Sequence, residues 1–304
     1  MPSSDNFYIP SHTRHVFIVF HCNFCYSILP FKKVERETVI NLVESYYAGK
    51  SIFITGASSG LGWALAEALA PFRVKLGLLS RREEKLQELA DRLRNSGSDV
   101  WLQSCDVQNK DAVFKAVNAF HEHTGSLDVA WINSGVSHSS YFSVWDWEKV
   151  EAIINTNLMG AIYTTKACAD IMVQQKSGTI AAIGSVASAR GLPKHGIYSM
   201  TKIALNHYIE SLSAELPELQ FTIIHPGFVD TPINTGNPNR IFLQTPEKAA
   251  QLMLKAVAQK KRIYIYPWQL RVLYPVIRVL PASIYARLSK KLVGMRKEES
   301  KGKP

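Results

Sequence analysis

The chain has 304 residues, of which 46% are hydrophobic, 10% aromatic and 20% charged. This composition is typical of a folded globular protein and excludes a disordered or fibrous chain. Four cysteines in a chain of this length do not make a disulfide scaffold, and Cys105 and Cys168 lie in apolar runs typical of a core. We expect these thiols to be reduced, which favours a cytoplasmic location.

The formal net charge is +10, and its position is more informative than its size. Twelve lysines and arginines follow residue 259 against two glutamates, so residues 1–259 are neutral overall. Nucleic-acid-binding proteins usually carry basic charge as a patch or stripe on the folded body. The distribution therefore argues against a nucleic-acid partner and marks a basic C-terminal end.

Residues 1–47 are unlike the rest of the chain, and we expect a poorly ordered or non-native extension there. The run 15–31 is apolar, but polar residues and a proline interrupt it, so it falls short of the ~20 apolar residues of a membrane span. It also lacks the small-residue cleavage site of a signal peptide. Cys22 and Cys25 have no second ligand pair at a suitable spacing, so no metal site is expected.

From Lys50 onward, short β-rich runs alternate with helical patterns. The predicted strands are Ser51–Thr55, Val74–Leu79, Val100–Gln103, Asp128–Ile132, Thr179–Gly184, Gln220–His225 and Arg262–Tyr266. The predicted helices are Leu61–Ala70, Glu83–Asn95, Asp111–His123, Trp145–Gln175, Tyr198–Glu215 and Pro246–Gln259. Such alternation predicts an α/β fold with a parallel sheet covered by helices on both faces, which binds ligands at the carboxyl ends of its strands.

A glycine-rich turn separates the first predicted strand from the first helix, in the run Thr55-Gly56-Ala57-Ser58-Ser59-Gly60-Leu61-Gly62. Glycines allow a tight turn and a close approach of the backbone to a pyrophosphate. The N–H groups and the positive dipole end of the following helix can then hold the anion. Many glycine turns bind nothing, but a strand before and a helix after this one favour a nucleotide site.

This turn resembles the cofactor loop of the classical short-chain dehydrogenase/reductase family, and the resemblance extends over roughly Lys50 to Pro267. Asp106-Val107 matches the adenine-contacting position of the family. Ile132-Asn133-Ser134-Gly135 stands where the family usually has Asn-Asn-Ala-Gly, so the motif is degenerate but keeps Asn133 and Gly135. Further along, the chain matches the segment that borders the nicotinamide, at Pro226, Gly227, Val229 and Thr231.

The resemblance implies one doubly wound domain of the Rossmann type, with about seven parallel strands and helices on both faces. We expect this NADP-binding catalytic domain at residues 48–267, between the extension 1–47 and a basic amphipathic helical tail at 268–304. The candidate cofactor-binding residues are Thr55, Gly56, Ser58, Ser59, Gly60, Leu61, Gly62, Arg81, Arg82, Asp106, Val107, Asn133, Gly135, Tyr198, Lys202, Pro226, Gly227, Val229 and Thr231.

The end of the second predicted strand indicates which nicotinamide cofactor is used. NAD-preferring relatives carry an acidic residue there, which accepts a hydrogen bond from the ribose 2′-hydroxyl. This chain instead has Ser80-Arg81-Arg82, with no carboxylate to repel a 2′-phosphate. Two guanidiniums can bind that phosphate through charge-assisted hydrogen bonds, unless they are solvated residues of the helix start. The sequence therefore favours NADP(H) over NAD(H).

Tyr198 and Lys202 are four residues apart on a predicted helix, so they share one face. A Tyr–Lys pair at this spacing is common by chance, but this one follows Gly184-Ser185 at the interval of the family's Ser…Tyr-x-x-x-Lys signature. Asn157 matches the fourth catalytic residue of the family. The resemblance implies that Ser185 holds the substrate oxygen, that Lys202 binds the nicotinamide ribose, and that Asn157 supports a relay water.

Hydride reduction of a ketone leaves an alkoxide that must be protonated, and these residue types suit that step. A free tyrosine has a pKa of ~10, too high for proton exchange near neutrality. A positive charge ~4 Å away, at an effective dielectric of ~20, favours the phenolate by ~4 kcal/mol as an upper limit. We therefore expect Lys202, together with the pyridinium of an oxidised cofactor, to lower the pKa of Tyr198, which would act as general acid and base.

Two parts of the chain bear on substrate and partners. The short stretch Pro232–Thr245 carries apolar residues and predicts a pocket for a lipophilic carbonyl or secondary alcohol. The substrate-contacting candidates are Ser185, Leu192, Tyr198 and Phe228. The basic, apolar tail can lie on a membrane surface, pack on a subunit of a homo-oligomer, or pack on its own domain.

The leading interpretation is an NADP(H)-dependent oxidoreductase that acts on the CH–OH group of a small molecule. The alternative from another class is a catalytically silent NADP(H) sensor of the same fold. A sugar-nucleotide epimerase or dehydratase uses a related Tyr–Lys pair, but usually with a longer substrate domain and a different glycine spacing. His195 and His225 lack a triad-like partner in the sequence, so both are expected to be ordinary loop histidines.

Overall fold

A computed structural model describes residues 36–235 and 240–292, and in these ranges seven strands form one parallel sheet. The strands lie in the order β3-β2-β1-β4-β5-β6-β7, so the order reverses at β1. All seven predicted strands are present, with ends shifted by at most one residue. Their bounds are β1 Ser51–Thr55, β2 Lys75–Ser80, β3 Asp99–Ser104, β4 Val129–Ile132, β5 Thr179–Ile183, β6 Gln220–Pro226 and β7 Ile263–Tyr266.

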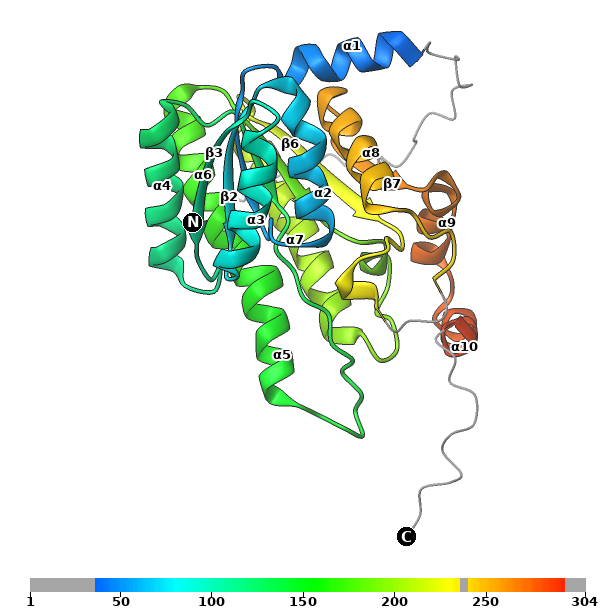
Figure 1. Cartoon of the computed structure of the whole chain (residues 1–304). Helices are drawn as coiled ribbons and strands as arrows, with labels where there is room; N and C mark the ends of the chain where they lie inside the picture. Colours follow the sequence, from blue (N-terminus) through cyan, green and yellow to red (C-terminus); the bar gives the residue numbers. More distant parts are fainter. Residues whose placement is uncertain (1–35, 236–239, 293–304) are drawn as a thin grey trace, which may run out of the picture. The chain divides into compact units, whose positions relative to one another are not determined.

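Helices cover both faces of this sheet, as the alternating pattern predicts (Figure 1). One core lies between the sheet and α2, α3 and α8, and the other lies between the sheet and α4, α6 and α7. The central strand β1 is buried along its whole length because it has a core on each side. The helices are α1 Arg36–Tyr47, α2 Gly60–Leu69, α3 Glu83–Arg94, α4 Lys110–Thr124, α5 Trp147–Ile154, α6 Gly160–Gln175, α7 Gly196–Glu215, α8 Pro246–Ala258, α9 Trp268–Val279 and α10 Ala282–Leu292.

The long helix predicted over Trp145–Gln175 is divided into three parts. It begins at Trp147, because Asp146 caps it by accepting a hydrogen bond from the Lys149 N–H at 3.2 Å. A π-helical turn, Asn155–Met159, then joins α5 to α6. Such widened turns occur inside helices and often lie at functional sites, which fits the position of this one around Asn157.

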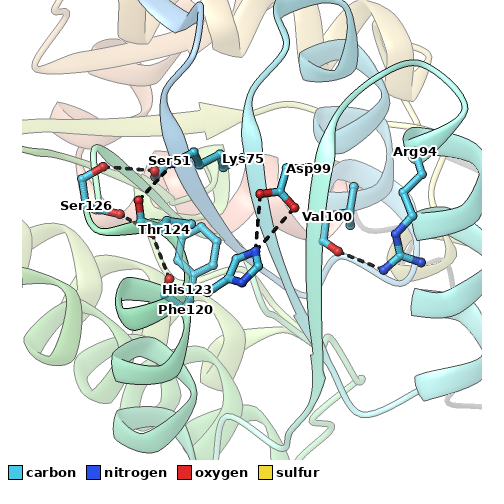
Figure 2. A network of polar contacts seen from close by, with 9 residues as sticks. All are labelled: Ser51, Lys75, Arg94, Asp99, Val100, Phe120, His123, Thr124 and Ser126. Carbon is cyan, nitrogen blue, oxygen red and sulfur yellow. Dashed lines mark hydrogen bonds and ion pairs between the residues drawn. The ribbon is translucent and has the colours of Figure 1, made fainter.

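A network of polar contacts joins the amino ends of the strands to the helices beside them (Figure 2). Lys75 Nζ, at the start of β2, donates to the carbonyl of Thr124 at the end of α4 at 3.1 Å. Ser51 Oγ, at the start of β1, lies 3.1 Å from Ser126 Oγ, and His123 Nε2 lies 3.4 Å from an Asp99 carboxylate oxygen. These contacts hold together the amino ends of the strands. The candidate site residues gather at the opposite, carboxyl ends.

The packed part of the chain begins earlier than the predicted boundary at residue 48. Helix α1 runs over Arg36–Tyr47, and the side chain of Tyr47 is fully buried. Its hydroxyl donates to the carbonyl of Leu254 in α8 at 3.2 Å. The expectation of a poorly ordered segment is therefore wrong for this helix, because its aromatic end packs into the main core.

The predicted tail also contributes to the folded domain. It forms α9 and α10, and the side chains of Leu270 and Tyr274 in α9 are buried against Ala189 and Ile265. One face of α9 thus packs on the domain, while the basic residues 293–304 lie outside the described ranges. Of the three alternatives for the tail, packing on its own domain is therefore the one that α9 shows.

The apolar run 15–31, with Cys22 and Cys25, also lies outside the described residues. Among the residues that the structure does describe, no helix combines the length and the apolar character that crossing a bilayer requires. Cys105 and Cys168 are buried free thiols, as the sequence predicts.

Substitution of Tyr47 tests the packing of α1. Tyr47→Ala is expected to lower the free energy of unfolding by about 3–5 kcal/mol, because it removes a buried aromatic ring and leaves a cavity. Tyr47→Phe should cost about 1 kcal/mol, the typical contribution of one hydrogen bond. Urea unfolding followed by circular dichroism measures both, with exposed Glu44→Ala on the same helix as the control. A Tyr47→Ala variant as stable as this control would contradict the packing.

Candidate active site

The glycine-rich turn leads directly from β1 into α2 at the carboxyl edge of the sheet. Gly56 and Gly60 have φ of 69° and 58°, which glycine adopts without a steric penalty. A Cβ at Gly62 would lie 2.4 Å from the carbonyl oxygen of Gly56, so this close approach requires glycine. Ser59 gives α2 no side-chain cap. The first N–H groups of the helix therefore remain suited to binding an anion.

Asn133 holds the turn against the neighbouring strand β4. Its Nδ2 donates to the carbonyl of Thr55 at 2.9 Å, and its backbone N–H donates to Thr55 Oγ1 at 3.0 Å. The N–H of Ser134 donates to the same hydroxyl at 3.1 Å. The degenerate motif thus keeps the residue that joins the ends of β1 and β4, although Ile132 replaces the first asparagine.

The two arginines after β2 occupy different positions. Arg82 Nη2 donates to Ser58 Oγ at 2.9 Å and to Ser59 Oγ at 2.6 Å, so its guanidinium lies on the glycine-rich turn. Arg81 instead pairs with Asp106, with 3.8 Å between Nη1 and Oδ2. Only Arg82 is therefore held directly at the predicted phosphate loop.

The segment after β6 contacts the same turn. A Cβ at Gly60 would lie 3.2 Å from the side chain of Thr231, so the two predicted cofactor segments meet there. Val229 is buried, and its carbonyl accepts from Asn234 Nδ2 at 2.8 Å. A Cβ at Gly227 would lie 2.4 Å from Leu270 of α9, so glycine allows α9 to pack closely on this segment.

Tyr198 and Lys202 lie on one face of α7, as their spacing predicts. Lys202 Nζ is 5.8 Å from the centre of the Tyr198 ring and donates to the carbonyl of Ile183, at the end of β5, at 2.7 Å. The side chain of Lys202 is buried. Burial lowers the pKa of the ammonium to about 8. Lys202 is therefore able to release a proton closer to neutrality than a surface lysine.

The pKa of Tyr198 in the chain alone depends on its burial. Burial raises the pKa of the phenol, and a side-chain hydrogen bond with Ser185 opposes this rise without overcoming it. Desolvation of the phenolate therefore dominates in the chain alone, and the lowering expected from Lys202 together with the pyridinium of an oxidised cofactor stays a prediction. The hydrogen bond nevertheless places the Ser185 hydroxyl beside the phenol.

Asn157 is fully buried in the π-helical turn. Its Oδ1 accepts from the Val136 N–H at 2.7 Å, and its Nδ2 donates to the Val136 carbonyl at 2.8 Å. A Cβ at Gly135 would lie 3.5 Å from Asn157 Oδ1 and 3.8 Å from Lys202 Nζ. Gly135, Asn157 and Lys202 thus lie close together after the carboxyl end of β4. Both polar atoms of the Asn157 side chain form hydrogen bonds with the backbone of Val136.

The candidate substrate residues Leu192 and Phe228 lie in the loop before α7 and directly after β6. Leu192 and Phe228 are partly buried, and the Leu192 N–H donates to Ser199 Oγ in the first turn of α7 at 3.3 Å. Large apolar side chains are exposed in the loop before α5 and in the stretch after β6, at Tyr141, Phe142, Val144, Ile233, Ile241, Phe242 and Leu243.

Asp106, the residue at the predicted adenine position, accepts a hydrogen bond from the Gln108 N–H at 3.0 Å, which shapes the turn after β3.

The sequence interpretation treats His225 as an ordinary loop histidine, but the structure places its ring beside Ser185. His225 lies at the end of β6, not in a loop, and its Nδ1 is 3.2 Å from the Ser185 nitrogen and 3.0 Å from the Ser185 carbonyl oxygen. Its ring stacks on Tyr274 of α9, with 5.2 Å between centroids. The place of His225 directly before Pro226-Gly227, a predicted cofactor segment, is a signal in the sequence that this histidine lies near the site. No local pattern in the sequence indicates that Tyr274 lies there too. His195 precedes α7 and makes no side-chain cap there.

Comparisons with known proteins agree with this arrangement. A family model described as short chain dehydrogenase matches residues 50–240. An uncharacterized oxidoreductase of Myxococcus xanthus is 34% identical over 246 residues, which cover 80% of this chain and 97% of that protein. The 11-beta-hydroxysteroid dehydrogenase-like protein 4A of Arabidopsis thaliana is 31% identical, with 79% of this chain and 83% of that protein covered.

Solved structures give the same result. An alcohol dehydrogenase from Thermococcus sibiricus, complexed with 5-hydroxy-NADP, has a TM-score of 0.66 at 28% identity and covers 71% of this chain and 94% of its own. A short-chain dehydrogenase/reductase from Burkholderia phymatum, in complex with NAD, has a TM-score of 0.69 at 26% identity and covers 76% and 93%. The chain belongs to the short-chain dehydrogenase/reductase family of oxidoreductases.

Proposed function

We propose that this protein transfers a hydride between NADP(H) and a lipophilic carbonyl or secondary alcohol, with Tyr198 as general acid and base. The observation that carries the proposal is the convergence of Ser185, Tyr198 and Lys202 at the carboxyl edge of the sheet, beside the glycine-rich turn. Parallel sheets bind nucleotides at this edge, where the strand order reverses. A bound nicotinamide would supply the hydride, and the chain supplies binding, orientation and a proton.

Each side chain has a role that fits its environment. Ser185 orients the substrate oxygen toward the Tyr198 hydroxyl, which gives up its proton as the alkoxide forms. Lys202, with its pKa lowered to about 8, can return a proton to this group near neutrality. Asn157 binds the backbone of Val136 and so fixes the segment that lies beside the Lys202 ammonium.

Replacement of Tyr198 separates catalysis from cofactor binding. Tyr198→Phe removes the proton donor and is expected to lower kcat by about 10²–10⁴-fold, the usual contribution of a positioned general acid. NADPH oxidation against a panel of hydrophobic ketones and aldehydes measures this loss. Thermal stabilisation by NADPH should be retained, since the ring stays in place. NADPH binding by the unaltered protein without turnover of any substrate would favour the silent sensor instead.

The preference for NADP(H) rests on Arg82. Its guanidinium contacts both serines of the glycine-rich turn, next to the end of β2, where a ribose 2′-phosphate would lie. Arg81 is engaged with Asp106 and is a weaker candidate. The relative from Thermococcus sibiricus was solved with an NADP derivative and the one from Burkholderia phymatum with NAD, so residues of this chain must support the choice.

Substitution of each arginine tests the assignment. Arg82→Ala should weaken NADPH binding by about 10–100-fold, the equivalent of one charge-assisted hydrogen-bonded contact, and leave NADH binding nearly unchanged. Arg81→Ala is the matched control at the neighbouring position and should have a smaller effect. Titration by nucleotide fluorescence gives both dissociation constants. Equal losses for NADPH and NADH in Arg82→Ala would contradict recognition of the 2′-phosphate.

A second proposal is that α9 contacts an anionic membrane surface from a cytoplasmic location. Trp268, Val272 and Val276 recur every four residues on α9 and are exposed, while Leu270 and Tyr274 are buried. The whole positive excess of the chain lies from residue 260 onward. An apolar face with basic neighbours suits a lipid interface with anionic headgroups. A second copy would bring like charges together, so a bilayer fits this surface better.

Vesicle flotation tests this contact. The full chain should float with vesicles that contain phosphatidylserine, and Trp268→Glu combined with Val272→Glu should reduce recovery several-fold, because carboxylates oppose burial in an anionic interface. Trp147→Glu is the matched control, since Trp147 and Trp268 are both 67% exposed. Recovery that is the same with neutral and anionic vesicles, or unaffected by the double substitution, would contradict the proposal.

A further inference from the structure

The segment from Ser185 to Gly191 leads away from β5 and lies against the C-terminal helices. Ser185 begins it as the cap of the turn Val186–Ser188, and its Oγ accepts from the Ala187 N–H at 3.1 Å. Ser188 closes the turn, because its Oγ donates to the Ser185 carbonyl at 2.6 Å. The position of the Ser185 backbone thus depends on what holds Ser188.

Helix α9 holds Ser188 through Tyr274. The Tyr274 hydroxyl lies 2.9 Å from Ser188 Oγ, and both side chains are buried, with 5% and 3% of their surface exposed. The ring of Tyr274 also stacks on His225, with 28° between the planes. A hydrogen bond at a buried position resists exchange with water, so this contact fixes the turn to α9.

His225 holds the same turn from the sheet. It is 2% exposed, and its Nδ1 lies within hydrogen-bond distance of the Ser185 backbone and 3.4 Å from Ser188 Oγ. Burial lowers the pKa of His225 to about 4, so the ring is neutral near pH 7 and can accept from the Ser185 N–H. A Cβ at Gly184 would lie 2.7 Å from this nitrogen, which shows how closely the ring packs on the chain before Ser185.

Further contacts tie the end of the segment to the region of α10. Arg190 Nη1 donates to the carbonyl of Leu280, between α9 and α10, at 2.7 Å. Its guanidinium lies 4.7 Å from the centre of the Tyr285 ring, and the Tyr285 hydroxyl donates to the carbonyl of Gly191 at 2.9 Å. The first part of the loop that joins Ser185 to the helix of Tyr198 is therefore anchored by the C-terminal helices at Ser188, Arg190 and Gly191.

We propose that α9 and α10 complete the active site, with Tyr274 and His225 as positioning residues that hold the Ser185 turn in its reactive geometry. The proposal rests on the proposed function of Ser185. The match to the family model ends at residue 240, so these helices lie beyond the part of the chain that it covers. Positioning of this kind affects turnover, because small displacements of a group that orients the substrate slow the reaction strongly.

The test compares two tyrosine-to-phenylalanine variants of the full chain. Tyr274→Phe removes the contact to Ser188 but keeps the ring, and is expected to lower kcat about 10-fold with an unchanged KM for NADPH. Tyr266→Phe is the matched control, since Tyr266 is also buried and its hydroxyl also has one partner, Met253 Sδ at 3.2 Å. Amide hydrogen exchange of residues 184–191 should speed up in Tyr274→Phe and stay as in the unaltered protein in Tyr266→Phe.

The two readouts distinguish the possible failures. Unchanged exchange of residues 184–191 in Tyr274→Phe would overturn the anchoring of the turn. Faster exchange with an unaltered kcat would overturn the positioning role, and so would an equal fall of kcat in Tyr266→Phe. If the unaltered protein shows no turnover, the proposed function fails, while the exchange experiment still decides whether α9 holds the turn.

A double variant tests whether Ser188 and Tyr274 act through one contact. If they do, Ser188→Ala combined with Tyr274→Phe should have a kcat no lower than that of the slower single variant.

Discussion

Because β1 pairs with β2 on one side and with β4 on the other, the strand order reverses at this strand and its carboxyl end opens between two crossovers. Everything in the candidate site depends on that pairing. The glycine-rich turn continues β1, and Asn133 at the end of β4 binds the Thr55 backbone at the point where the turn begins. A shift of register between these strands would separate the turn from the residues that follow β4 and β5.

Two buried polar side chains at the carboxyl ends of the strands, Lys202 and Asn157, are bound by backbone, which limits their freedom. Transfer of an ammonium from water into a protein interior costs several kcal/mol unless a partner compensates. Lys202 has the Ile183 carbonyl as that partner, and Asn157 has both polar atoms of Val136. The orientation of these side chains is therefore set by the backbone at the ends of β4 and β5.

Local patterns in the sequence predict most of the fold and part of the site. Apolar runs bounded by turn residues predict all seven strands, and the glycine spacing with Tyr198 and Lys202 predicts which strand ends carry the site. Contacts between distant segments leave no such pattern. Tyr47 packs on a helix more than two hundred residues away along the chain, and Tyr274 reaches the Ser185 turn from α9. The phenol pKa also depends on burial, which only the folded chain determines.

The polar network at the amino ends of β1, β2 and β3 lies at the opposite end of the strands from the candidate site. Loops at the carboxyl edge, such as the exposed apolar stretch around Phe142, can therefore change in length and composition without loosening the contacts that hold the strands in register. Divergence of substrate choice among related chains would then proceed at one edge of the sheet, while the opposite edge preserves foldability.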